Sequence, residues 1–224
     1  MKSRHLALPA LALPLLLGAC SSLLNVQRTP FTIYSPQYTA ERSAGAPVDW
    51  QLVVETPLAS ETLATARILV MPSPGVIEVF PGARWSDPAP SMLRDLAVRG
   101  FEASGRIVGV GSAVSGLRAD YALAIDLHAF QIEIVDGAPR AAVRFQARLL
   151  DYTSNRVLAA RSFSAEEAAS GTDASGAFEA FQQALNHSVA ELVDWTLTTG
   201  EADRASTDRP APVADSPRAA QRRQ

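Results

Sequence analysis

Runs of apolar residues predict a series of β-strands between residues 31 and 165. Apolar stretches with the length of strands lie at 31–35, 50–56, 66–72, 75–80 and 106–111. The run at 66–72 is continuous, which is typical of a strand buried on both faces. Further along, apolar positions from Ala141 to Leu149 alternate with arginine and glutamine, as in a half-exposed strand. The turn sequences DGAP and DYTSN join this segment to 120–135 and 156–165, which predicts an antiparallel meander of three strands.

The segment from Asp120 to Val135 changes phase along its length. Apolar residues occupy odd positions in its first half and even positions in its second: Tyr121, Leu123, Ile125 and Leu127, then Phe130, Ile132 and Ile134. Because side chains alternate between the two faces of a strand, a regular strand would put these sets on opposite faces. The pattern predicts a β-bulge near Ala129, or a strand whose two halves cover different layers.

Helical periodicity predicts two helices. The first has Asp87 as N-cap, Pro88 at its first position and Gly105 as its C-terminal stop. The second spans Ser175 to Leu197, has one apolar stripe and is capped by Asp173 or Ser175. Helices covering a mixed sheet in two or three layers make an α/β domain.

A leader precedes the predicted domain. Lys2 and Arg4 are followed by an apolar run at 6–19 that is interrupted by two prolines, a secretory signal pattern. The run is shorter than the roughly 20 residues that a membrane span needs. Leu17-Gly18-Ala19-Cys20 resembles the lipobox of bacterial lipoproteins, which implies cleavage after Ala19 and lipid attachment to Cys20. Serine at the following position implies sorting to the outer membrane, with the domain in the periplasm. The alternatives for Cys20 are a buried core cysteine or a chance residue beside a signal peptide.

The composition suggests one domain with flanking segments. We expect a signal peptide at 1–19, a lipidated tether at 20–28, one domain at 29–198 and a disordered tail at 199–224, which contains no aromatic residue. Cleavage of the leader would remove Lys2 and Arg4. The remaining chain contains 18 arginines and 23 acidic residues, which gives a net charge near −5. That balance provides no basic patch for nucleic acid.

Few residues suggest chemistry. Asp126 and His128 share a parity on one strand, but no third ligand is evident, so we expect no metal and no other cofactor. The glycine- and serine-rich segment 109–116 lacks the spacing of a nucleophile elbow, which favours a loop, and no catalytic residue is assigned. Arg84 and Trp85 are interface candidates if both are exposed; a buried Trp85 would instead seal the first helix against the sheet.

An ordered set of segments resembles the ABC-type transport auxiliary lipoproteins, the PqiC-like proteins of paraquat-inducible and MCE-type lipid transport systems. The segments lie at 63–75, 82–93, 101–106, 119–131 and 177–185, with Trp195 near the domain end. The resemblance implies a three-layer α/β/α fold with a mixed sheet, similar to the anticodon-binding-domain and TolB N-terminal architecture. It also implies an outer-membrane lipoprotein that partners an MCE-domain protein. It supplies no catalytic residues.

Three functions remain open at this point. The first is a non-catalytic lipoprotein that docks through sheet edges or loops onto an MCE protein or onto its own copies. The second is a periplasmic lipid-binding carrier whose sheet–helix groove holds the cargo. The third and weakest is a lipoprotein hydrolase, for which the sequence supplies no convincing set of titratable groups.

Overall fold

The computed structural model describes residues 30–39, 45–171 and 173–207. The fold below is that of the compact unit that begins at Thr32. The predicted signal peptide, Cys20 and the tether lie outside the described residues, as do residues 208–224 of the predicted tail. Within the described ranges, no helix has both the length and the apolar character needed to cross a membrane.

Strand β7 (Tyr121–Val135) is the centre of the sheet because its length lets it pair with several neighbours. One of its edges pairs antiparallel with β8 (Ala138–Asp151), which in turn pairs antiparallel with β9 (Val157–Ala168). These strands are the predicted meander, which is confirmed. The β7–β8 turn contains Asp136 and Gly137, both with positive φ.

The other edge of β7 pairs in parallel with three shorter strands in succession. These are β2 (Leu52–Val54), β3 (Leu58–Ala59) and β4 (Arg67–Ser73). Outside β4 lie the antiparallel β5 (Val76–Trp85) and, parallel to β5, β1 (Thr32–Tyr34). Strand β6 (Val110–Ser112) pairs in parallel with β2. The sheet is therefore mixed, as predicted.

A bulge at His128 explains the change of phase in β7. Leu127 pairs with Phe145 and Ala129 pairs with Arg144, so His128 is the extra residue in the ladder. Phe130 then pairs with Val143, two positions from Phe145 and on the same face of β8. Both halves of β7 thus direct their large apolar side chains to one core, and the bulge alternative is confirmed.

Helix α2 (Ala89–Ser104) begins one residue later than predicted. Its N-cap is Pro88, in an extended conformation, and no side chain caps the helix, so the prediction of Asp87 as N-cap is wrong. Pro88 and Pro90 have no N–H, which leaves fewer donors in the first turn to be satisfied. Gly105 ends the helix with φ 66°, as predicted.

Helix α3 (Ala174–Thr207) is longer than predicted at its C-terminal end. Its start agrees with the sequence, because the Asp173 carboxylate accepts a hydrogen bond from the Gly176 N–H at 3.0 Å. Its last turns include residues 199–207, so the predicted domain boundary at 198 and the prediction of disorder for 199–207 are wrong. Gly200 in this part packs so closely on Trp50 that an added Cβ would lie 2.5 Å from the indole ring. Burial of Trp50 accounts for the extra helix.

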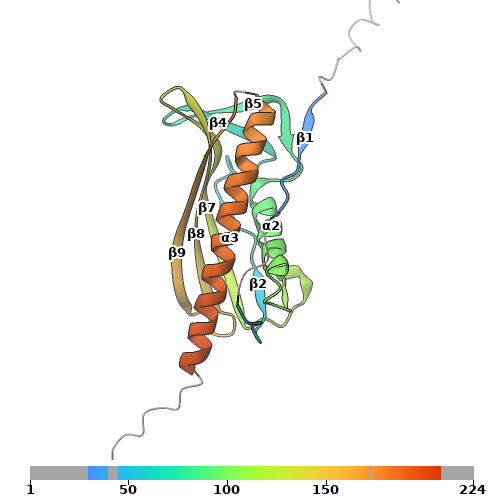
Figure 1. The fold of residues 1–224 in the computed structure, drawn as a ribbon, viewed down its shortest axis with the longest axis vertical. Coiled ribbons are helices and arrows are strands. Elements are labelled where there is room, and N and C mark those ends of the chain that lie inside the picture. Colours follow the sequence, from blue (N-terminus) through green and yellow to red (C-terminus); the bar gives the residue numbers. More distant parts are fainter. Residues whose placement is uncertain (1–29, 40–44, 172, 208–224) are drawn as a thin grey trace, which may run out of the picture. The chain divides into compact units, whose positions relative to one another are not determined.

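Both helices belong to one core. A Cβ on Gly100 of α2 would lie 2.6 Å from the Val189 side chain of α3, and the buried residues of both helices join those of the sheet in one cluster. Figure 1 shows α2 and α3 side by side against the sheet. The α/β class is confirmed, but the described helices form one layer on one face rather than the two outer layers of an α/β/α sandwich.

Charged residues on the other face explain this layering. Arg144 on β8 forms ion pairs with Glu133 on β7 and Glu166 on β9, and Arg148 pairs with Asp126 at 2.9 Å. Such a face is stable in water and offers no apolar stripe on which a second helical layer would pack.

Candidate functional site

The interface candidates Arg84 and Trp85 do not form a joint surface site. Adjacent residues of β5 point to opposite faces, so Arg84 is exposed while Trp85 is fully buried. The Trp85 ring makes edge contacts with Phe130 and Phe181, at centroid distances of 5.6 and 5.0 Å. Trp85 therefore joins the sheet to α3, and of the two residues only Arg84 is exposed.

Asp126 and His128 both lie on β7, and His128 is the bulge residue. His128 is exposed, whereas Asp126 pairs with Arg148. No cluster of three or more histidine, cysteine, aspartate or glutamate side chains able to hold a metal occurs in the described residues. Asp126 is thus held by an arginine of β8 rather than by His128.

The glycine- and serine-rich segment forms strand β6 and the 3₁₀ turn η1 (Ala113–Ser115). The Ser115 hydroxyl donates to the Ser112 carbonyl at 2.7 Å, within the same turn. The segment therefore has a local structural role and does not present its serine on a strand-to-helix elbow.

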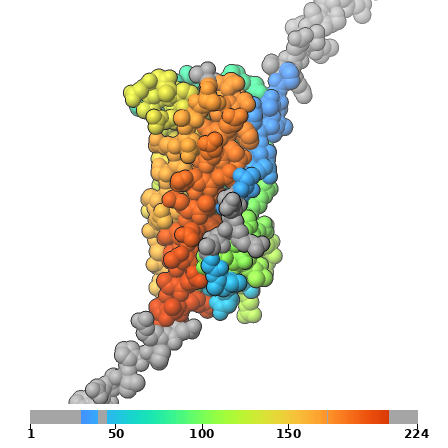
Figure 2. All heavy atoms as spheres, viewed as in Figure 1, coloured from blue at the N-terminus to red at the C-terminus, as the bar shows by residue number. Residues whose placement is uncertain are grey.

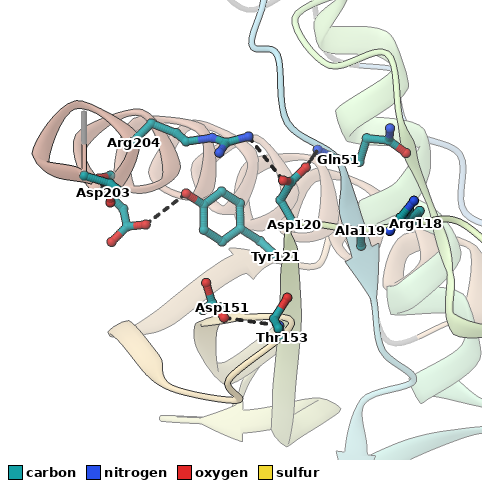
Figure 3. A pocket seen from close by; sticks show the side chains of 10 residues that line it. Gln51, Arg118, Ala119, Asp120, Tyr121, Asp151, Thr153, Asp203 and Arg204 are labelled. Atoms are coloured by element: carbon teal, nitrogen blue, oxygen red, sulfur yellow. Dashed lines mark hydrogen bonds and ion pairs between the residues drawn. The ribbon is translucent and has the colours of Figure 1, made fainter.

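A polar cleft of about 430 Å³ lies where the start of β7, the β8–β9 turn and the end of α3 meet (Figure 3). It is lined chiefly by Gln51, Asp120, Tyr121, Asp151, Asp203 and Arg204. Arg204 of α3 donates to the Asp120 carboxylate at 3.1 Å, and the Tyr121 hydroxyl donates to Asp203 at 3.0 Å. These contacts tie the last turns of α3 to the sheet.

The protonation states of the cleft also favour a structural role. Burial, together with the hydrogen bond to Asp203, raises the pKa of Tyr121, so its phenol stays protonated at neutral pH. Hydrogen bonds from the backbone and hydroxyl of Ser154 lower the pKa of Asp151. A protonated phenol, a stabilised carboxylate and the paired Asp120 do not constitute a general base with a nucleophile beside it.

We did not predict this cleft, because its α3 residues fell in the expected tail. The available signal was the run of helix-favouring Glu201, Ala202 and Arg204 before the first proline at 210. Glycine has a low helix propensity, so Gly200 indicated that the helix ends before these residues.

The turns of two hairpins lie together at the opposite end of β7. Val70 of β4 pairs in parallel with Ile132 of β7. The β4–β5 turn and the β7–β8 turn therefore lie at the same end of the strands. Val76, Ile77, Val79 and Val135, which we call the apolar tip, each keep 40–44% of their surface exposed. Figure 2 shows both turns at the end of the unit where α3 begins. Exposed apolar residues gathered in this way are typical of an interaction surface.

An apolar pocket of about 160 Å³ lies just behind the tip. It is lined by Val70, Phe80, Ile132, Ile134, Pro139 and Ala177, with Gly171. Dry apolar cavities of this size bind small apolar molecules such as benzene. The pocket can therefore hold part of an apolar chain, whereas the polar cleft cannot.

The sequence itself identifies the family. The profile of the ABC-type transport auxiliary lipoprotein component matches residues 31–193. The chain belongs to this family. The match spans the sheet from its first strand to most of α3, and with it the apolar tip and apolar pocket.

Two solved structures are similar to this chain. Protein XCC0632 from Xanthomonas campestris is 40% identical in sequence, and its crystal structure covers 78% of this chain and 99% of its own, with a TM-score of 0.74. The crystal structure of an uncharacterized protein, 17% identical, shares the fold with a TM-score of 0.59 over 74% of this chain and 98% of its own.

A curated relative is longer. The uncharacterized protein bll6063 of Bradyrhizobium diazoefficiens is 28% identical over 175 residues, which cover 76% of this chain and 45% of the relative. The chain thus spans less than half the length of that relative.

Proposed function

We propose that this auxiliary lipoprotein is anchored in the outer membrane and serves, without catalysis, an ABC/MCE-type system that moves lipids between membranes. The observation that carries the proposal is the family membership of residues 31–193. The lipobox ending at Cys20 supports the anchor, and Ser21 after it supports the outer membrane. The energy for transport comes from the system's ATPase.

The proposed mechanism is docking. Strands β6 and β9 each pair with one neighbour in the described sheet, so each leaves an edge for a partner. An MCE-domain protein is the proposed partner, and further copies of this chain are a second one. The absence of catalysis is supported by the polar cleft, whose titratable groups hold α3 in place.

The experiment that tests this function is cross-linking in native membranes, followed by purification of the chain and mass spectrometry of what is recovered. An MCE-domain protein is expected, together with a mature N-terminus that carries acyl chains on Cys20. The matched control is Cys20→Ser behind an ordinary cleavable leader, which should be exported but released from the membrane. Recovery of neither the partner nor the acyl chains would contradict the proposal.

A lipid-binding carrier is the second candidate, and the apolar pocket is the observation that favours it. Ala177 is buried against the pocket, so Ala177→Leu fills the space. If the chain carries lipid there, this variant should recover less phospholipid after gentle purification than the wild type. Ala190→Leu, on a half-buried position of α3 outside the pocket lining, is the control. Equal phospholipid from all three chains would rule out the pocket as a carrier site.

A further inference from the structure

The apolar tip carries no basic residues that would suit a negatively charged partner. Beside its four apolar side chains lie the exposed carboxylates Glu78 and Asp136, and the exposed Arg140 lies two positions beyond Ala138, which pairs with Val135. One arginine beside two carboxylates leaves no net positive charge, so a contact made by this end depends on burial of apolar surface. The surface is formed by two protruding turns, which suits shallow insertion among neutral headgroups better than it suits a flat interface.

Strand β1 begins at its end nearer to the apolar tip. Strand β1 runs parallel to β5, with Thr32 beside Ala83 and Tyr34 beside Trp85. Because β5 begins at the apolar tip and runs away from it, Thr32 is the end of β1 nearer to the tip. In Figure 1, β1 starts at the upper end of the ribbon, the end at which β4 and β5 are labelled.

The tether is long enough to bring the tip to a bilayer. Val76 precedes Ala83 by seven residues, which corresponds to about 23 Å along an extended strand. Cys20 precedes Thr32 by twelve residues, which reach at most about 42 Å. An anchor on Cys20 thus leaves the tip free to contact the membrane that holds the acyl chains.

We propose that the apolar tip inserts shallowly into the same leaflet as the lipid anchor, so that it fixes the orientation of the domain on the membrane. This inference rests on the lipid anchor proposed above. Burial of Val76, Ile77, Val79 and Val135 at the level of the headgroups and upper acyl chains supplies the free energy. The sheet then stands away from the membrane, with the polar cleft at the distal end.

A single fluorescent label tests the orientation. Acylation consumes the thiol of Cys20, the only cysteine, so Ile77→Cys gives the lipidated full chain one free thiol for an environment-sensitive dye. The labelled protein is reconstituted in phosphatidylcholine vesicles whose acyl chains carry bromine near the headgroup. We expect blue-shifted emission and strong quenching at position 77, unchanged between low and high salt.

The matched control is a label at Val114→Cys. Val114 is 92% exposed and lies beside β6, which is joined through β2 to the start of β7. That place is fourteen residues, about 46 Å, from the end of β7 at the tip. We expect its emission to remain that of the dye in water, with no quenching by bromine.

A second set of variants tests whether apolar burial is the cause. With the label at Val135→Cys, adding Val76→Asp and Ile77→Asp should reduce quenching to the level found at position 114. Adding Val108→Asp and Val114→Asp instead should leave it unchanged, although these two valines are 95% and 92% exposed. All four sites are at the surface, and circular dichroism verifies that the variants are folded.

The outcomes separate the inference from the anchor. A lipidated chain whose label at 77 escapes bromine quenching overturns the inference and leaves the anchor intact. Blue-shifted emission that rises with protein concentration and ignores bromine would show a second copy on the tip, and also overturns it. A chain without acyl groups on Cys20 overturns both.

Discussion

Single residues define how closely the helices approach each other. Gly100 of α2 faces Val189 and Val193 of α3, and a Cβ added there would lie 2.6 and 3.1 Å from their methyl groups. β-branched side chains in a helix have one preferred rotamer, so these methyl groups cannot easily move aside. The absence of a side chain at position 100 is what permits the helix pair.

We expect Gly100→Ala to lower the free energy of unfolding by about 1–3 kcal/mol through overpacking, despite the better helix propensity of alanine. Denaturant unfolding measures the change. Val189→Ala is itself destabilising, but combining it with Gly100→Ala should cost less than the sum of the two single changes. Additive effects would show that the two residues do not touch.

Tyr121 makes stability depend on pH at the alkaline end. Burial raises its pKa in the folded chain above the value of about 10 in the unfolded chain. The unfolded state therefore loses its proton first, and this contribution to stability is complete below pH 10 and declines as the pH rises above it.

We expect Tyr121→Phe to flatten the decline in stability above pH 10, as measured by urea unfolding at several pH values. The variant also loses the hydrogen bond to Asp203, so it should be less stable than the wild type at neutral pH. Tyr152→Phe, on the exposed β8–β9 turn, is the control and should retain the wild-type profile. An unchanged slope in Tyr121→Phe would contradict the assignment.

At the scale of elements, the bulge in β7 decides which residues face the core. His128 itself is exposed. As the extra residue of the bulge, it allows Leu127 and Phe130, which are three positions apart, to point to the same face of the sheet. Its side chain is therefore replaceable while its position in the backbone is not.

Deleting His128 should turn the second half of β7 over, or break its pairing with β8, because a one-residue slip exchanges the two faces. The expected loss exceeds about 4 kcal/mol, which is most of the free energy of unfolding of a domain at the low end of the usual range. His128→Ala is the control and should unfold near the wild-type midpoint. A folded deletion variant would show that the bulge is dispensable.

The last turns of α3 form a second element whose role is testable. In these turns Gly200 packs on Trp50, and Glu201 forms an ion pair with Arg106. Asp203 and Arg204 form the hydrogen bonds to Tyr121 and Asp120 in the polar cleft. Trp50 is 2% exposed in their presence.

A chain ending at residue 198 should lose roughly 3 kcal/mol or more of unfolding free energy, because Trp50 and Tyr121 become exposed. Its Trp emission should shift to the red. A chain ending at residue 207 keeps every contact described here and should match the full chain. Equal free energies of unfolding for the two truncated chains would show that the folded domain ends at residue 198.

At the scale of the whole molecule, one core joins the sheet to both helices. Trp50 and Trp85 report on its two ends, since their partners Gly200 and Phe181 are nineteen residues apart on α3, about 28 Å. A core without a boundary predicts cooperative unfolding.

We expect variants that keep Trp50 or Trp85 as the reporter, with the other tryptophans changed to phenylalanine, to give fluorescence midpoints that coincide with each variant's own circular dichroism midpoint. Both tryptophans lie in the same cluster of buried residues, which is the physical reason. A midpoint for Trp50 well below that of the helical signal would show that the cleft end unfolds separately.

The sequence alone determined the features that depend on local pattern. The meander, the bulge, the Asp173 cap, the Gly105 stop and the family resemblance each follow from periodicity or from residues adjacent in the chain, and the structure or the family profile confirms them. The lipid site at Cys20 remains a prediction of the same kind.

Only the tertiary structure decided the features that depend on distant contacts. The last turns of α3 make contacts with residues far earlier in the chain: Gly200 packs on Trp50, 150 positions before it, and Arg204 binds Asp120. The two helices share one face because the other carries cross-strand ion pairs. Trp85 is buried by the packing of α3. The apolar tip exists because the turns of two separate hairpins lie at the same end of the sheet. Burial is a property of what packs against a residue, and a local sequence pattern does not contain its partners.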